Sequence, residues 1–404
     1  MPSANLDLIR AINQFNILNS IRMKGAVSRS EIADMTGQSR ASVTTITAQM
    51  IEKGLIFERN TECTGERGRN RVLLALNPDA AFVVGVKLAV TKMSCAVCDM
   101  QGVTRSANVW EENFRRKNVE FITGFIEEIT RETVKEAGLS MNNISGIGVG
   151  VPGVVDSTTG TCHWSPLYEA GEVPLRDRLH DQLKITTYIE NDANTLTLVH
   201  QWFGEGKGVN NFLVITIEEG VGMGIIANGQ LFRGSRGFAG EMGHVPVVLG
   251  GEICVCGKRG CLATVLGSMA VIRQATQVAQ KGLWIRDTDS EITFDEIVDA
   301  AKSGQKDLID ILNSAGHHLG VGISMLINIF NPEKIIISGQ GVEAGELMFK
   351  PMNDTIKRHT FSDMLALTKI VVPEWHHTDW AKGAASLVLQ ELYKSPFNTI
   401  RPVI

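Results

Sequence analysis

The sequence lacks the features of a membrane or secreted protein. Among its 404 residues there is no uninterrupted apolar run of the roughly 18 residues that a membrane-spanning helix needs. The first residues, MPSANLDLIRAINQ, contain no basic region followed by an apolar stretch, which is the pattern of a secretory signal. We therefore expect a cytoplasmic protein without membrane insertion.

Cysteine is scarce, and its count is odd. Seven cysteines in a long chain without a signal argue against a disulfide framework and favour free thiols or a metal site. Cys95 and Cys98 fall in a predicted strand, where side chains three residues apart point to opposite faces. We interpret this pair as core residues, and not as metal ligands or a redox pair.

Neither sign of charge is in large excess, but the two signs are unevenly distributed. The net charge is −5. Residues 1–80 contain 10 Lys and Arg against 8 Asp and Glu, a balance of +2, so the remainder contains 29 against 36, a balance of −7. A chain of this length is expected to form two or three domains. The asymmetry suggests a separate N-terminal module with an anionic partner.

The N-terminal segment shows helical patterns. Apolar residues at helical spacing predict a helix over residues 6–23 that ends at Gly25. Ser28 and Glu31 then form the S-x-x-E pattern of a capping box, which predicts a second, short helix through Met35. A Thr-Gly turn follows and precedes a third helical pattern.

The third predicted helix has the composition of a DNA recognition helix. It is capped by Ser39, runs to about Lys53, and carries short polar side chains at its N-terminal end. Small side chains let a helix approach the major groove, while Arg and Gln can reach base edges. The expected buried stripe is Val43, Ile46, Met50 and Ile51. The expected DNA contacts from the turn and this helix are Gln38, Ser39, Arg40, Ser42, Thr44 and Thr45.

Residues 58–77, ERNTECTGERGRNRVLLALN, have the composition of a wing. A polar stretch with four arginines and two glycines lies between two strand-like runs, and Arg67, Arg69 and Arg71 are expected to contact phosphates or a minor groove. The pattern predicts a winged helix-turn-helix domain over residues 1–80. The alternative is a three-helix interaction module with a solvated basic loop.

Two later segments resemble each other and predict a duplicated α/β body. One hairpin pattern begins at Phe82 and the other at Phe212, and each opens a stretch with helical patterns. This duplication suggests the actin-like (sugar-kinase or ribonuclease H-like) architecture, in which a ligand lies between two lobes. We expect a first lobe over 81–200, completed by a C-terminal helix at about 380–404, and a second lobe with dimerisation helices over 201–380.

The stretch GEMGHVPVVLGGEICVCGKRGC, residues 240–261, predicts a metal site. One imidazole and three thiolates in a glycine-rich loop make a four-coordinate set for Zn²⁺ that leaves no position open for water. A closed site of this kind is structural: it holds a loop in shape and does not activate a nucleophile. The alternative is three incidental buried cysteines. The predicted ligands are His244, Cys254, Cys256 and Cys261.

Together these motifs resemble the ROK family, which is named for its repressors, open reading frames and kinases. The resemblance extends from about residue 6 to the C-terminus. It is carried by the zinc ligands, Glu241-x-x-His244, Glu190-Asn191-Asp192, Pro152-Gly153 and the strand with glycine turn at 331–342. The helix-turn-helix makes the chain similar to the family's glucose, N-acetylglucosamine and xylose repressors.

The resemblance implies a sugar site. In family kinases the carboxylate that matches Asp192 removes the proton from the attacking sugar hydroxyl, and other matching residues hold the remaining hydroxyls. The implied effector site, for a sugar or sugar phosphate, consists of Asn191, Asp192, Glu241 and His244. If the chain is instead a sugar kinase with an appended DNA-binding module, Asp192 is its catalytic base. A bland alternative for Asp192 is a helix N-cap.

Three departures from the kinases lead us to expect no enzyme and an unusual sugar. The first phosphate loop, D-x-G-G-T-K in the kinases, is KLAVTK at 87–92 and has lost its acid and both glycines. The second, IEEGVG at 217–222, carries two carboxylates, and like charges 4 Å apart near a surface cost about 4 kcal/mol. Its glycines remain, which leaves residual ATP binding open. Ala263 stands where the family commonly has a sugar-binding Glu.

The resulting hypothesis is a transcriptional regulator, by resemblance a repressor, of genes for carbohydrate uptake or catabolism. Its expected partners are double-stranded operator DNA, the effector, and copies of itself in a homodimer or tetramer; a protein of a sugar-transport system is a further candidate. A kinase would instead phosphorylate a sugar with MgATP. An interaction protein would show no salt-dependent DNA binding.

Overall fold

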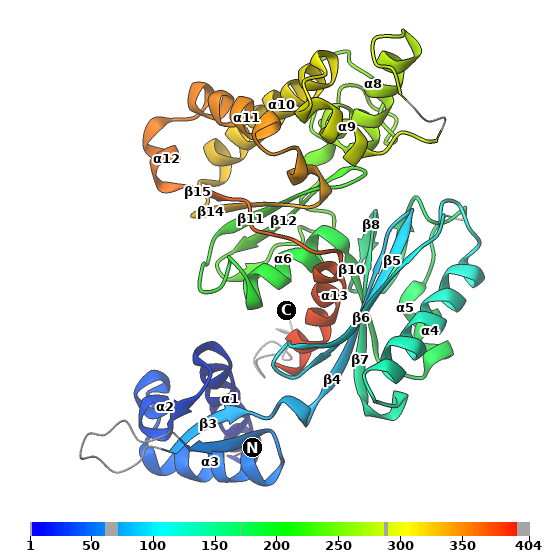
Figure 1. Ribbon diagram of the computed structural model, residues 1–404. Coiled ribbons are helices and arrows are strands. Elements are labelled where there is room, and N and C mark those ends of the chain that lie inside the picture. The colour runs from blue at the N-terminus through cyan, green and yellow to red at the C-terminus, as the bar shows by residue number, and fades with distance from the viewer. Residues whose placement is uncertain (1, 61–71, 170, 287–289, 394–404) are drawn as a thin grey trace. The chain divides into compact units, whose positions relative to one another are not determined.

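The computed structural model describes residues 2–60, 72–169, 171–286 and 290–393 (Figure 1). The chain divides into two compact units. The first comprises residues 1–151, 159–190 and 380–404, and the second comprises residues 152–158 and 191–379. None of the helices in the described part of the chain combines the length and apolarity that crossing a membrane requires.

The N-terminal part of the first unit is a winged helix-turn-helix, as predicted. Three helices pack with a small antiparallel sheet of order β1-β3-β2. Their bounds are α1 (Pro2–Lys24), β1 (Val27–Ser28), α2 (Arg29–Thr36), α3 (Arg40–Glu52), β2 (Ile56–Asn60) and β3 (Val72–Leu76). The predicted wing contacts Arg67, Arg69 and Arg71 lie outside the described residues.

Local hydrogen bonds explain where these helices begin. Ser28 and Glu31 form the predicted capping box of α2, and the Ser39 hydroxyl accepts from the amide of Ser42 at 3.1 Å to cap α3. The expected buried stripe of α3 needs one correction: Thr47 is fully buried, whereas Ile51 is only half-buried. At about 100° per residue, Thr47 lies about 40° from Val43 around the helix and Ile51 about 80°.

The body contains two sheets with the same strand order, which confirms the predicted duplication. The first sheet has the order β10-β7-β4-β5-β6 and the second, read in the same sense, β15-β14-β11-β12-β13. The first consists of β4 (Phe82–Leu88), β5 (Lys92–Asp99), β6 (Thr104–Glu111), β7 (Ile144–Val151) and β10 (Thr187–Asn191). The second consists of β11 (Phe212–Ile217), β12 (Val221–Ala227), β13 (Gln230–Leu231), β14 (Lys334–Ser338) and β15 (Lys369–Val371).

In each sheet the opening strand pairs antiparallel with its hairpin partner and parallel with the strand on its other side. Thus β4 pairs with β5 and β7, and β11 pairs with β12 and β14. All six residues of β11 are buried, as expected for a strand covered on both faces. Two α/β halves built on one strand order are the actin-like fold that the hairpin patterns predicted.

Helices cover both sheets (Figure 1). On the first sheet, α13 lies on one face and α4 and α5 on the other; on the second sheet, α6 lies opposite α10 and α11. Buried residues of β11, β14, α10 and α11 share one hydrophobic core. The bounds are α4 (Val119–Glu136), α5 (Leu175–Leu183), α6 (Asp192–Phe203), α7 (Ala263–Leu266), α8 (Ser268–Gln280), α9 (Phe294–Lys302), α10 (Lys306–Phe330), α11 (Glu346–His359), α12 (Ser362–Leu367) and α13 (His377–Leu392).

Cys95 and Cys98 both lie in β5 and are fully buried. Burial raises the pKa of the Cys95 thiol to about 12 and that of Cys98 to about 11. Both are therefore protonated at neutral pH, which agrees with the interpretation of this pair as core residues.

Candidate functional site

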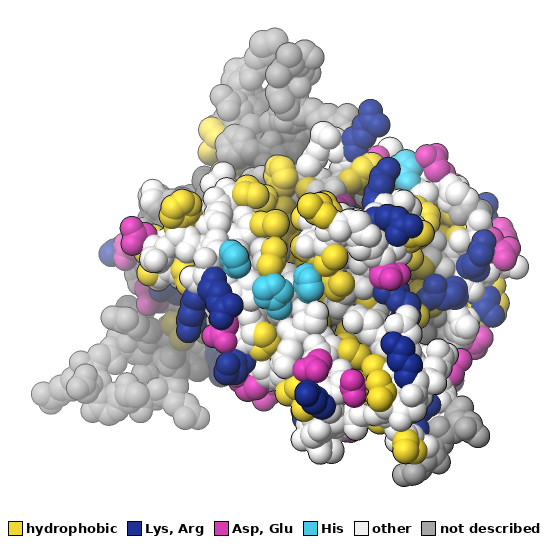
Figure 2. Space-filling view, turned by 90° about the horizontal axis from the view of Figure 1, so that it is seen from above, with side chains coloured by type: hydrophobic (Ala, Val, Ile, Leu, Met, Phe, Trp, Pro, Cys, Tyr) yellow, Lys and Arg dark blue, Asp and Glu magenta, His cyan; other side chains and the backbone are white. Residues whose placement is uncertain are grey.

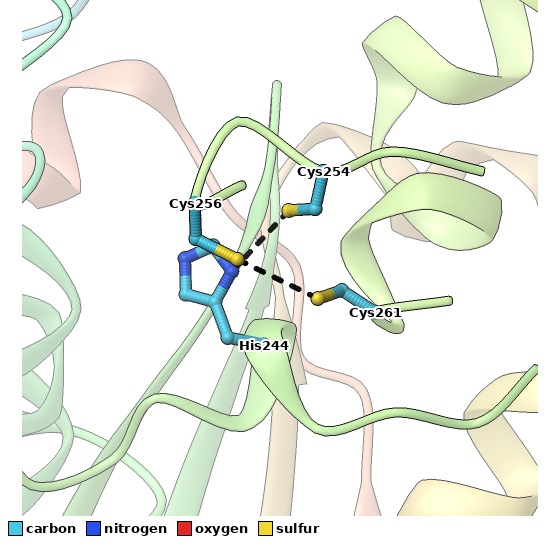
Figure 3. Close-up of side chains that lie close together, drawn as sticks. All are labelled: His244, Cys254, Cys256 and Cys261. Carbon is cyan, nitrogen blue, oxygen red and sulfur yellow. Dashed lines mark hydrogen bonds between the residues drawn. The ribbon is translucent and has the colours of Figure 1, made fainter. Parts of the chain in front are cut away.

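The predicted metal ligands converge in the second unit. His244 is the last residue of the 3-10 helix η3 (Met242–His244), and Cys254, Cys256 and Cys261 come from the loop that follows. Figure 3 shows the imidazole and the three sulfur atoms turned toward one another, and all four ligand atoms lie within 4.8 Å of each other.

Two distances test whether this group fits a tetrahedral ion. The sulfur atoms of Cys256 and Cys261 are 3.7 Å apart, and the Cys254 sulfur lies 3.4 Å from Nδ1 of His244. Zinc bonds of about 2.3 Å to sulfur and about 2.0 Å to nitrogen, at tetrahedral angles, require about 3.8 Å and about 3.6 Å. The residues therefore form a four-ligand group that could hold a metal with little rearrangement.

Backbone contacts preset the shape of this loop. Residues 246 and 261 form one antiparallel bridge and residues 253 and 259 another, and the Cys254 amide donates to the Lys258 carbonyl at 2.8 Å. Gly260 has a φ of +76°, and a Cβ there would lie 1.7 Å from the Val248 carbonyl oxygen. Only glycine fits at that position, which gives the glycine-rich sequence of the loop a physical reason.

The pKa values of the four side chains are shifted by burial and by one another. Burial, followed by the neighbouring Cys256 and Cys254, raises the pKa of Cys261 to about 12, while the Lys258 amide lowers the pKa of Cys256. Burial lowers the pKa of His244, which favours the neutral imidazole that a metal requires. Without a cation Cys261 therefore stays protonated, and a metal ion between the sulfur atoms would favour the thiolate form.

The other nitrogen of His244 faces a second predicted site residue. Nε2 lies 3.8 Å from Oε2 of Glu241, whereas Nδ1 faces the sulfur atoms. The Glu241 side chain keeps 47% of its surface exposed, and its pKa is raised, first by partial burial and second by the negative charge of Asp192. Glu241 therefore lies near His244 and within electrostatic reach of Asp192.

Asn191 and Asp192 mark the transition from β10 to α6. The side-chain oxygen of Asn191 accepts from the Asn194 amide at 3.3 Å, so Asn191 caps α6, and not Asp192 as the alternative prediction had it. Its side-chain nitrogen donates to the Gly153 carbonyl at 3.0 Å. Asn191 thus ties the Pro152-Gly153 turn to the start of α6, beside Asp192.

The first kinase-loop position, residues 87–92, is a packed hairpin turn. The Ala89 amide donates to the Lys92 carbonyl at 3.0 Å, and Val90 is 4% exposed. None of these residues has a positive φ. Lys87 is buried with Nζ 4.6 Å from the ring centre of Trp380, a cation–π contact within the first unit. This turn has neither the glycines nor the backbone shape of a phosphate loop.

The second kinase-loop position, residues 217–222, carries an internal anion. Oε1 of Glu218 accepts from the amide of Gln340 at 3.1 Å, next to Gly339 in the turn after β14. Sequence reasoning missed this contact because 122 residues separate the partners. The signal was present nonetheless, since β11 and β14 are parallel neighbours whose carboxyl ends meet at one edge of the sheet.

The predicted DNA contacts gather at the start of α3. Ser39, Arg40, Thr44 and Thr45 are exposed and Ser42 is half-buried. Gln38 is also half-buried, and its amide nitrogen donates to the Asn13 carbonyl of α1 at 3.2 Å, so it has a structural task as well. An unpredicted bond joins Arg10 of α1 to Gln49 of α3 at 2.6 Å.

Models of two families match different parts of this chain. The model described as "ROK family" matches residues 83–391, and the model described as "MarR family" matches residues 6–65. Among curated relatives, the xylose repressor of Caldicellulosiruptor bescii is 29% identical over 399 residues, covering 97% of this chain and 99% of the relative. The DNA-binding transcriptional dual regulator NagC of Escherichia coli K12 is 28% identical over 391 residues, covering 95% and 94%.

Solved structures show the same two-part similarity. A ROK family transcriptional regulator, described as a homolog of the E. coli MLC protein, superposes with a TM-score of 0.80 at 27% identity and covers 95% of this chain and 97% of its own. A ROK family glucokinase from Streptomyces griseus superposes with a TM-score of 0.66 at 27% identity and covers 76% and 99%. With its winged helix-turn-helix and duplicated α/β body, the chain belongs to the ROK family.

Proposed function

We propose that this protein is a sugar-responsive transcriptional repressor of carbohydrate uptake or catabolism genes, located in the cytoplasm. The observation that carries the proposal is that a winged helix-turn-helix is joined to a ROK body whose two kinase-loop positions differ from phosphate loops. Residues 87–92 form a packed hairpin turn, and residues 217–222 carry a carboxylate bonded to the Gln340 amide. Relatives similar over at least 94% of their own length are named repressors or regulators. The working parts we propose are residues 1–80, 81–200 with 380–404, and 201–380.

The effector is a sugar or sugar phosphate bound by Asp192, Glu241 and His244, with Asn191 holding the neighbouring turn in place. Carboxylates and an imidazole are suited to pair with several hydroxyls at once, and a wrong sugar would leave these polar groups unsatisfied. The nearness of Glu241 to His244 and the electrostatic effect of Asp192 on Glu241 support this assignment, and we call these three residues the sugar cluster.

The metal is a structural Zn²⁺ held by His244, Cys254, Cys256 and Cys261. When bound, it would neutralise the thiolates and link the ends of the loop; with four protein ligands it would leave no position for a reacting water. The chain's own residues then hold Glu241 in place, because His244 belongs both to the ligand group and to the sugar cluster.

The DNA-binding form is a homodimer or tetramer on two operator half-sites. Winged helix-turn-helix domains read half-sites at helical-turn spacing, so an effector can alter affinity by changing the placement of two heads. We assign the contact to α10 and α11. Met325, Ile329 and Phe330 of α10 are 40%, 75% and 45% exposed, and Figure 2 shows hydrophobic side chains gathered beside histidines on one face. A protein of a sugar-transport system is a further proposed partner.

A second candidate, a sugar kinase with an appended DNA-binding module, is favoured by the carboxylate of Asp192 at the start of α6 and by the similarity to a glucokinase. It predicts MgATP-dependent phosphorylation of a sugar that is abolished in Asp192→Asn. Robust turnover in a coupled assay across a sugar panel would overturn the repressor-only proposal.

The decisive test is selection of bound fragments from genomic DNA by the full-length protein, repeated with a sugar panel. We expect a two-fold-related sequence whose binding weakens steeply as salt rises and is changed by one sugar class. Absence of sequence-specific, salt-dependent DNA binding would contradict the proposed function.

A further inference from the structure

The chain end of α13 contacts the DNA-binding module within the first unit. Tyr393, directly after α13, is 5% exposed, and its hydroxyl donates to the Met100 carbonyl at 3.0 Å. The guanidinium of Arg22, near the end of α1, lies 5.7 Å from the centre of the Tyr393 ring. Burial lowers the pKa of Arg22 and raises that of Tyr393, so both side chains are largely shielded from water.

The hairpin turn that receives Tyr393 also holds the connection between β3 and β4. The Met100 amide donates to the Pro78 carbonyl at 3.1 Å, and the Gln101 side chain donates to the Leu76 carbonyl at 2.7 Å. Arg105 bridges Asp79 and Asp99 at 3.1 and 2.9 Å. The connection is therefore a fixed segment and not a loose linker.

The same connection is bonded to the DNA-binding module on its other side. The Asn77 amide donates to the Leu55 carbonyl at 3.0 Å, and its side-chain nitrogen donates to the Gly54 carbonyl at 2.7 Å. We call Arg22, residues 76–79, residues 99–102 and Tyr393 the junction. Four segments far apart in the sequence meet in it.

The other end of α13 lies at the boundary between the two units, which falls between Asp379 and Trp380. From there the helix rests directly on the first sheet. A Cβ on Gly85 of β4 would lie 1.8 Å from the Ala381 carbonyl oxygen, and one on Gly148 of β7 would lie 1.8 Å from that of Ala384. Helix backbone thus touches strand backbone without intervening side chains, so α13 is held firmly on the first sheet up to the junction.

We infer that the junction sets the direction of the DNA-binding module, with Tyr393 and Arg22 as its positioning residues. Both residues act on the module indirectly, Tyr393 through the β5–β6 turn and Arg22 through α1. A DNA-binding module that is already oriented loses less rotational freedom when two modules bind the two half-sites of an operator. Non-specific DNA binding does not require a fixed orientation of the modules. The operator part of this inference rests on the proposed function.

The test compares Tyr393→Phe, which removes only the hydroxyl, with the control Tyr188→Phe, which removes a hydroxyl from half-buried Tyr188 of β10 in the same unit. Hydrogen exchange is measured on full-length proteins. We expect about tenfold faster exchange at residues 76–80 and 99–102 in Tyr393→Phe alone, because one of the bonds that close the junction is lost. Exchange of the first sheet and of α3 should not change.

The second readout is binding to a selected genomic operator and to a scrambled duplex of equal length. Tyr393→Phe should weaken operator binding about tenfold and leave scrambled binding unchanged; Arg22→Lys, which keeps the charge but loses the planar guanidinium, should act in the same direction. Unchanged exchange at the junction would overturn the inference, as would equal weakening on both duplexes. If the wild type shows no operator preference, the proposed function fails, and the exchange result still decides whether the junction is held by Tyr393.

Discussion

The loop at 244–261 and the turn at 217–222 are both glycine-containing segments of the second unit, yet they handle charge in opposite ways. In the loop, three thiols and an imidazole point at one another and form a group that could hold a cation. In the turn, Glu218 supplies an anion from within the chain to the amide of Gln340. The loop thus groups side chains that could bind a metal, whereas at the second kinase-loop position one of the chain's own carboxylates binds a backbone amide.

The largest expected effect comes from emptying the loop. Chelation, or Cys261→Ser at a fully buried ligand, should remove the metal and lower the free energy of unfolding by more than about 4 kcal/mol, because loss of a structural metal ranks among the most damaging changes. Metal content by atomic absorption and the melting temperature measure it. Cys98→Ala, a buried thiol outside the loop, should keep the metal; its loss there would contradict the ligand assignment.

The next effect concerns protonation of His200, which would place a positive charge in the interior of the second unit. Burial lowers the pKa of His200, on α6, to about 4, and neither ring nitrogen has a hydrogen-bond partner among the described residues. As pH falls, His200 is protonated in the unfolded state before it is protonated in the folded state. Its contribution to the free energy of unfolding is therefore fully present above pH 6.5 and is lost as pH falls toward 4. The loss should approach about 3 kcal/mol. Denaturant unfolding at pH 7 and pH 5 tests this, and in His200→Gln the pH dependence should shrink; an unchanged pH dependence would count against it.

A smaller effect separates binding from positioning at the start of α6. Asp192→Asn should reduce effector affinity by about 2 kcal/mol, or about thirtyfold, while unfolding changes little, since charged hydrogen bonds to ligand are lost. Asn191→Ala should instead destabilise the protein by about 1 kcal/mol through the lost cap. Calorimetric sugar titration and thermal melting give the two numbers. Equal effects of both variants on stability would contradict the assignment of effector binding to Asp192 and helix capping to Asn191.

The smallest effect addresses the turn. Glu218→Gln should cost about 1 kcal/mol of stability, because the bond to the Gln340 amide becomes neutral, whereas Glu346→Gln, which removes the same charge from an exposed side chain of the same unit, should cost less. Neither variant should bind MgATP, because the turn at 87–92 still lacks the glycines of a phosphate loop. Titration with a fluorescent ATP analogue checks this. Binding by Glu218→Gln would mean that the Glu218 carboxylate alone prevents nucleotide binding.

Local patterns in the sequence predicted much of the fold. Caps at Ser28 and Ser39 depend on side chains reaching amides three residues away, and the four metal ligands are close in sequence. The duplicated hairpins predicted two sheets of equal order, because strand pairing across a short turn is itself local.

What the sequence did not predict depends on contacts between distant segments. The bond from Glu218 to Gln340 and the contact between Arg22 and Tyr393 arise only once sheets and helices have packed. Asn191 was expected to hold a sugar, and its cap and its bond to Gly153 became visible only with the turn beside it. Even the buried face of α3 shifted, since burial follows the angle around the helix and not hydrophobicity alone.

The two-sided placement of His244 has a consequence for the direction of hydrogen bonding in the sugar cluster. Its Nδ1 faces the sulfur atoms and its Nε2 faces Glu241. When Nδ1 serves as a ligand, the ring's one proton resides on Nε2, so His244 can only donate there. When Nδ1 binds no metal, the proton can move to Nδ1, and Nε2 can then accept a hydrogen bond with its lone pair. A loop that need not touch the effector would thereby decide whether the cluster offers a proton or accepts one.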